Sequence, residues 1–202
     1  MNPKTSNLWK KQAAKLPVIG ILALLACSMP CVADDAAQPV TYRTVGAEDY
    51  QSFIGNWDEK KDPVLCAVIQ TPQNWDALFH PAAFGYGKNT QKKPFGPDAK
   101  IFEKEQLLVV ARVMPSLPDG QWKEVFKVEE VSASGDVLTL RYRFEPKSGT
   151  AFTSRVAFTV KNFLGVIVPK HDYKKITFVE NGKTVGELDL ASGQWAVPTI
   201  GK

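Results

Sequence analysis

The sequence predicts a mainly β protein, a small antiparallel sandwich or partly closed barrel of seven or eight short strands with one short helix. Residues 138–144 place an apolar side chain at every second position, which is typical of a strand with one face buried and the other in water. Asn181-Gly182 lies between two strand-like runs and is the strongest short-range signal for a β-hairpin. Turn residues recur at short spacing along the chain, as they do in all-β folds.

The first strand and the single helix are predicted next to each other. Residues 64–70 form a continuous apolar run, which suits a strand buried on both faces. A helix is predicted over residues 72–79, because Thr71 can cap it and Pro72 fits its first position. Its large apolar side chains are three and four residues apart and share one face: Trp75, Leu78 and Phe79.

Two irregular segments are predicted to be loops. Residues 81–99 are rich in Gly, Pro and Lys and show no strand or helix period. Long loops in compact domains are commonly functional, so Phe84 and Tyr86 become candidates for binding a ligand or partner. The strand predicted at residues 106–113 ends in a second loop, which contributes Gly120 and Trp122 to the same candidate surface.

The second half of the chain contains further strand patterns. Residues 156–160 alternate between apolar and polar side chains, so we expect them to be the antiparallel neighbour of residues 138–144. Residues 163–168 are predicted to form another short apolar strand.

The hairpin around Asn181-Gly182 also predicts a register. A two-residue loop places Glu180 opposite Lys183 and Phe178 opposite Val185. One pair would then join opposite charges, and the other would join two apolar side chains.

Residues 1–33 have the pattern of a signal peptide. Four Lys precede a short apolar stretch, and no acidic residue occurs before Asp34. The apolar stretch is shorter than the roughly 20 residues that a membrane-spanning helix needs. Cleavage after Ala33 would release a periplasmic or secreted protein, which we favour, whereas Leu24-Leu25-Ala26-Cys27 resembles a bacterial lipobox and would tether the protein to a membrane through Cys27.

Removal of this segment changes the charge of the protein. The whole chain has a formal net charge of +4, and the 25 Lys and Arg less the four in residues 1–33 equal the 21 Asp and Glu. A balanced charge argues against a nucleic-acid-binding protein. We divide the remainder into a linker or edge-strand segment, residues 34–62, and a single β-rich domain, residues 63–202, on which we expect Trp57 to dock.

The cysteines follow the same two alternatives. Cleavage after Ala33 leaves Cys66 alone in an apolar run, where a free, buried and inert thiol is expected. If Cys27 is the lipid anchor, Cys31 remains and could form a disulfide with Cys66.

The sequence offers little that resembles a catalytic site. His80 and His171 are the two histidines, and neither has the spacing of a metal ligand. His171-Asp172 resembles a base and its orienting acid, but adjacent residues on a strand would point to opposite faces. There is neither a nucleophile elbow around a Ser nor a phosphate-binding glycine loop before a helix. We therefore expect no catalytic residues, metal, cofactor or nucleotide.

The order of motifs over residues 64–179 resembles the protease-complex accessory subunit family called PrcB. The resemblance lies in the Trp-bearing helix after a strand, the Phe102 entry to a hydrophobic strand, the loop Asp119-Gly120-Gln121-Trp122, and the late strand that ends at Val168-Pro169-Lys170. Ile101 stands where the family has an acid, and Gln121-Trp122 replaces its glycine-tyrosine pair. The resemblance implies a non-catalytic, exported accessory domain.

These observations lead to three functional hypotheses. The first is an exported envelope protein that binds another protein through residues 81–99 and 115–122. The second is a cell-wall or glycan-binding module that stacks sugars on Phe84, Tyr86 and Trp122. The third is a hydrolase with an unrecognised site.

Overall fold

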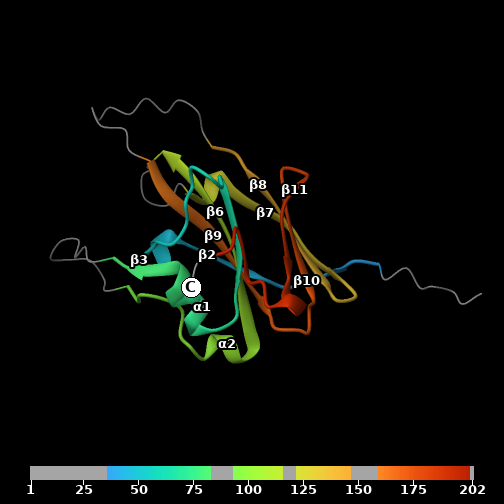
Figure 1. Cartoon of the computed structure of the whole chain (residues 1–202). Coiled ribbons are helices and arrows are strands. Elements are labelled where there is room, and N and C mark those ends of the chain that lie inside the picture. The colour runs from blue at the N-terminus through green and yellow to red at the C-terminus, as the bar shows by residue number, and fades with distance from the viewer. Residues whose placement is uncertain (1–35, 83–92, 116–121, 147–158, 201–202) are drawn as a thin grey trace, which may run out of the picture. The chain divides into compact units, whose positions relative to one another are not determined.

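The computed structural model describes residues 36–82, 93–115, 122–146 and 159–200 (Figure 1). These residues form two five-stranded sheets and a two-stranded sheet. The sheets do not close into a barrel, so the predicted mainly β sandwich is confirmed.

We call the two large sheets A and B. Sheet A has the order β1 (Gln38–Pro39), β7 (Phe126–Ser134), β8 (Val137–Phe144), β10 (Lys175–Glu180), β11 (Lys183–Asp189). Sheet B has the order β12 (Ala196–Val197), β4 (Val64–Ile69), β6 (Glu105–Pro115), β9 (Thr159–Pro169), β2 (Arg43–Gly46). The small sheet pairs β3 (Ser52–Ile54) with β5 (Phe79–Pro81). The short helical elements are η1 (Ala47–Asp49), α1 (Pro72–Leu78), α2 (Ile101–Lys104), α3 (Trp122–Val125) and η2 (Leu190–Ser192).

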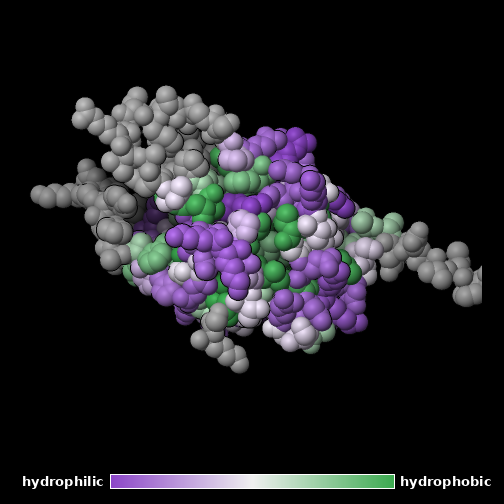
Figure 2. All heavy atoms as spheres, turned by 45° about the horizontal axis from the view of Figure 1, so that its top comes forward, coloured by the Kyte–Doolittle hydropathy of each residue, from purple (hydrophilic) through white to green (hydrophobic). Residues whose placement is uncertain are grey.

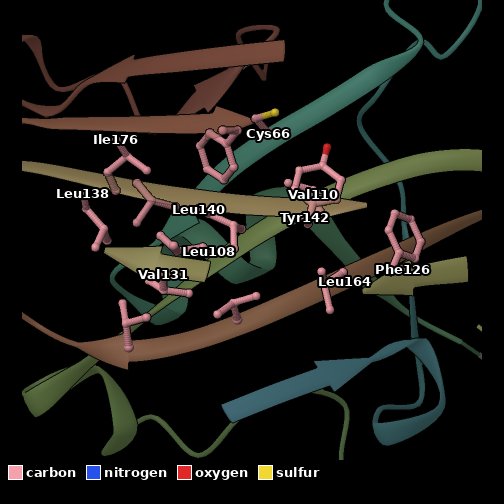
Figure 3. Packing of buried hydrophobic residues seen from close by; sticks show 14 of the residues in the cluster. Cys66, Leu108, Val110, Phe126, Val131, Leu138, Leu140, Tyr142, Leu164 and Ile176 are labelled. Carbon is pink, nitrogen blue, oxygen red and sulfur yellow. The ribbon is translucent and has the colours of Figure 1, made fainter. Parts of the chain in front are cut away.

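The main core lies between sheets A and B. The alternating residues Leu138, Leu140 and Tyr142 of β8 are fully buried, as the pattern of residues 138–144 predicts. Figure 3 shows them in one layer with side chains from β4, β6 and β9 of the other sheet, including Leu108 and Leu164.

A second core covers the opposite face of sheet B. Helix α1 and the small sheet pack there against the odd-numbered side chains of β6, such as Leu107 and Val109. Sheet B is therefore buried on both faces, which explains why residues 64–69 are apolar without a break.

Helix α1 forms where the sequence predicts it. The Thr71 side chain accepts a hydrogen bond from the backbone N–H of Asn74, and Pro72 occupies the first turn. Trp75 and Leu78 are buried on one face of the helix, and Phe79, buried beside them, ends the helix and begins β5.

The expected neighbour of residues 138–144 was wrong. Strand β8 pairs with β7 and, in parallel, with β10, whereas β9 pairs with β6 and β2. Residues 159–160 belong to the same strand as 163–168, and β9 is buried along most of its length. A strand buried on both faces belongs in the middle of sheet B, which overrides its closeness in sequence to β8.

The hairpin forms between β10 and β11 with a corrected register. Glu180 lies opposite Lys183 as predicted, but Phe178 lies opposite Gly186 rather than Val185, because a bulge shifts the ladder after Phe178. The backbone at residue 186 lies against Cys66 of β4, because a Cβ there would be 2.7 Å from Cys66 Sγ. Only glycine allows this close approach.

Residues 36–62 contribute edge strands and part of the core. Strand β1 borders sheet A and β2 borders sheet B. Trp57 is buried, and its Nε1 donates a hydrogen bond to the Asp62 carbonyl. The expected docking of Trp57 on the body is confirmed.

Candidate functional site

The predicted binding residues are only partly within the described structure. Phe84, Tyr86 and Gly120 lie outside the described residues. Trp122 is the first residue of α3, and its side chain lies outside the part of the chain that the structure describes. Residues 93–99, the end of the predicted loop 81–99, are described and line a groove.

The groove has a volume of about 750 Å³ and lies beside α2. Its apolar lining comes from Tyr50, which directly follows η1, from Pro94 and Pro97 of the loop before α2, and from Ile101 of α2. On the face shown in Figure 2, hydrophobic patches are separated by hydrophilic side chains rather than joined into one surface. A hollow with apolar side chains in its lining offers more contact to a ligand than a flat surface does.

A chain of aromatic contacts supports the wall of the groove. Phe163 of β9 meets Phe79 edge to face at 5.0 Å between ring centroids, and Phe79 stacks on Trp75 at 4.0 Å. Trp75 in turn meets Tyr50 edge to face at 5.0 Å. Tyr50 is thereby positioned by rings that extend into the core of sheet B, so its place in the groove is fixed before any ligand binds.

The loop wall is held against the same indole ring. A Cβ at Gly96 would lie 2.5 Å from Trp75 Nε1, so only glycine allows the backbone to lie this close. Pro94 and Pro97 flank this contact and restrict the backbone on both sides of it. The Pro94 carbonyl also accepts a hydrogen bond from the Gln51 N–H at 2.8 Å.

The charges along the groove balance each other. Arg43 of β2 donates to Glu105 of β6 at 2.6 Å, across the end of β9. Asp98 accepts a hydrogen bond from the Lys100 backbone N–H at 3.0 Å. Burial raises the pKa of the Tyr50 phenol, and the nearby Asp49 carboxylate adds to this effect. Tyr50 therefore remains a neutral hydrogen-bonding group at physiological pH.

A second polar arrangement joins the two sheets inside the sandwich. Glu180 of β10 is buried and accepts hydrogen bonds from Arg112 of β6, through Nε at 3.1 Å and through Nη2. Tyr142 of β8, fully buried, donates its hydroxyl to the same carboxylate at 2.9 Å. We call these three residues the inter-sheet cluster. Sequence reasoning missed it, because it assigned Glu180 a charge partner within its own hairpin.

Cys66 lies beside this cluster in the core (Figure 3). It is a free, buried cysteine, as predicted. Burial raises the pKa of its thiol to about 12, and the Glu180 carboxylate acts in the same direction. A thiol that stays protonated is a poor nucleophile, so this position favours a packing role.

His171 and Asp172 lie differently from the sequence-based expectation. They belong to the connection between β9 and β10 rather than to a strand, and both line one cavity with Gln70, Lys170 and Tyr173. His171 and Asp172 are therefore not required to face apart, as we predicted for a strand, because residues outside a strand need not alternate.

His80 lies in the small sheet. It stacks on Phe53 at 5.7 Å, and its ring lies so close to Gly55 that a Cβ there would be 1.9 Å from His80 Cδ2. Among the described residues, no group of three or more His, Cys, Asp or Glu could hold a metal ion. Within the same residues, we find no helix with the length and apolarity required to cross a bilayer.

Comparison of the chain with protein-family models, with curated proteins and with solved structures finds no match. The resemblance to the PrcB family therefore stays a prediction.

Proposed function

We propose that this chain is an exported protein-binding domain of the cell envelope, which holds an extended segment of a partner protein in the groove beside α2. The observation that carries the proposal is the groove's construction. Its apolar side chains stand on the aromatic chain from Phe163 to Tyr50 and on the Gly96–Trp75 contact, so little ordering is needed on binding.

The lining favours a segment that is largely uncharged. Arg43 and Glu105 already pair with each other, and Lys100 and Asp98 add one charge of each sign to the lining. A charged ligand would meet no excess of opposite charge, whereas apolar side chains can pack on Pro94, Pro97 and Ile101. Tyr50 adds a polar group that can fix the position of the bound backbone.

Strand β2 supports an extended conformation of the partner. Among the described residues β2 pairs with β9 alone, so its outer edge offers backbone N–H and C=O groups to a further strand. Arg43 belongs both to this edge and to the groove lining, so one segment could use both.

The cellular part of the proposal rests on the sequence. The basic and apolar pattern of residues 1–33 supports export. The resemblance to an accessory-subunit family agrees with a non-catalytic binding role. Release after Ala33 remains our preferred alternative to anchoring through Cys27.

Site-specific photo-cross-linking tests the proposal in the intact envelope. A photoreactive phenylalanine analogue replaces Ile101 in the groove or, as a matched control, Thr184 on the exposed part of β11. We expect irradiation to attach one defined protein at position 101 and not at position 184. Mass spectrometry of the product then gives the cross-linked segment of the partner.

A synthetic peptide of that segment completes the test. It should bind the wild-type protein and lose binding to Ile101→Asp, which places a charge in the apolar groove, while Thr184→Asp binds as the wild type does. Recovery of the protein uncross-linked from both positions would contradict the proposal. So would a peptide that binds all three proteins equally.

A further inference from the structure

A second cavity lies at one end of the sandwich, apart from the groove lining. It has a volume of about 440 Å³, opens to the surface, and is lined by residues of the connection between β9 and β10, by Gln70 after β4, and by Leu190 of η2. None of its lining residues belongs to the groove's lining. The volume is near the lower end of the range for small-molecule sites, roughly 300 to 1,000 Å³.

The cavity contains a cation that no acid neutralises among the described residues. The Lys170 ammonium donates to the backbone carbonyls of Gln70 at 3.3 Å and of Phe102 at 3.0 Å. Lys174 of the same connection and Lys175, the first residue of β10, are each paired with a carboxylate, at 2.8 Å. An ammonium carries three donors, so Lys170 keeps one N–H and its full charge for a ligand.

The other lining groups suit an anion with a polar substituent. His171 lies next to Lys170 and meets the Tyr173 ring edge to face at 5.2 Å, so an imidazole and an aromatic wall stand together. Asp172 is the one acid in the lining. It could receive the amino group of a ligand whose carboxylate is bound by Lys170.

The buried amide that is hydrogen-bonded to Gln70 has an unsatisfied donor. Gln106 is 1% exposed, and its Nε2 makes no hydrogen bond. Its Oε1 accepts from Gln70 Nε2 at 2.8 Å. If both side-chain amides rotate by 180°, the Gln106 NH₂ group donates to the Gln70 oxygen. The Gln70 NH₂ group is then free to donate to a ligand in the cavity.

From these observations we propose that the cavity binds a small carboxylate through the Lys170 ammonium, with Gln70 as a second donor. The inference goes beyond the proposed function, because it concerns another site and another class of ligand. Two sources share this chemistry: a free amino acid, whose ammonium would meet Asp172, and the C-terminal carboxylate of a peptide.

Nuclear magnetic resonance titration of the ¹⁵N-labelled mature protein tests the proposal. The probes are glycine, N-acetylglycine as a mimic of a peptide terminus, and glycinamide, which lacks the carboxylate. We expect saturable shifts of the Gln70 and Gln106 side-chain NH₂ signals with at least one of the two carboxylates and not with glycinamide. Tighter binding of glycine that disappears in Asp172→Asn identifies a free amino acid, and tighter binding of N-acetylglycine identifies a peptide terminus.

Variants separate the ligand contact from a structural role. Lys170→Met should weaken binding at least about tenfold, as expected for the loss of a charge-assisted hydrogen bond. Lys170→Arg should retain binding, and Lys174→Met, which removes a nearby paired cation, should leave it unchanged. The Tm of each variant verifies that it is folded. Absence of shifts with both carboxylates in the wild-type protein, or equal binding to folded Lys170→Met, would overturn the proposal.

Discussion

Replacement of Arg112 by Met is expected to lower the free energy of unfolding by about 3–5 kcal/mol, the usual cost of removing one partner from a buried ion pair. The Glu180 side chain is 8% exposed and that of Arg112 is 19% exposed, so water cannot replace the lost guanidinium well. Two hydrogen bonds to the carboxylate disappear, while Tyr142 continues to donate one. Urea denaturation of the mature protein at neutral pH measures the change.

A double-mutant cycle shows whether the loss arises from the pair itself. Glu180→Gln combined with Arg112→Met removes the stranded charge, so the double variant should be more stable than Arg112→Met alone, with a coupling energy of at least about 1.5 kcal/mol. The matched control is Arg141→Met. Arg141 pairs with Glu130 at 3.5 Å with both side chains 48% exposed, and its loss should cost less than about 1 kcal/mol. A coupling energy within about 0.5 kcal/mol of zero would refute the inter-sheet cluster as a stabilising unit.

Three further predictions concern the thiol, the groove wall and the mature terminus. Cys66 should resist alkylation in the native protein at pH 8 and react once the protein unfolds. Because the folded state keeps this thiol protonated up to a pKa of about 12, its contribution to stability should be intact below pH 9 and fall by about 1.4 kcal/mol per pH unit above it, measured by urea denaturation. Gly96→Ala should cost about 1–3 kcal/mol and change the tryptophan fluorescence, to which Trp75 contributes, because the new methyl group overpacks the indole; an unchanged spectrum and Tm would contradict this contact. The intact mass should correspond to a chain that begins at Asp34, and a lipid-modified mass beginning at Cys27 would reverse our choice.

The local elements could be predicted because their signals act over a few residues. Thr71 and Pro72 determine where α1 begins, and Asn181 and Gly182 both adopt positive φ, as their turn requires. The alternation in β8 reports one buried face directly. None of these features depends on knowing which strand lies next to which.

The strand order could not be predicted, because proximity in sequence does not decide it. Strand β9 leaves its neighbour in the chain and inserts between β6 and β2, where both of its faces are buried. Gly186 did carry a usable signal, since a glycine inside a strand often marks a close approach of another backbone or side chain. This signal could have indicated a bulge near Gly186 in the hairpin.

The candidate site was predictable as a region and not as a set of residues. The long loop 81–99 was identified from its composition, and its described end forms one wall of the groove. The other walls come from Arg43, Tyr50 and Ile101, which strand order and α1 packing bring together. Arg112 and Glu180 meet for the same reason, since they belong to strands of different sheets.

The binding that we propose, of an extended partner segment in the groove beside α2, can be tested directly. The most direct measurement is a titration of the mature protein with the peptide identified by cross-linking, followed through the Ile101 methyl and Tyr50 ring signals in the nuclear magnetic resonance spectrum. Binding in the groove should give saturable shifts at these two residues, with the Leu190 methyl signals of the separate cavity unchanged. Shifts confined to other residues, or no shifts for a peptide that binds, would contradict it.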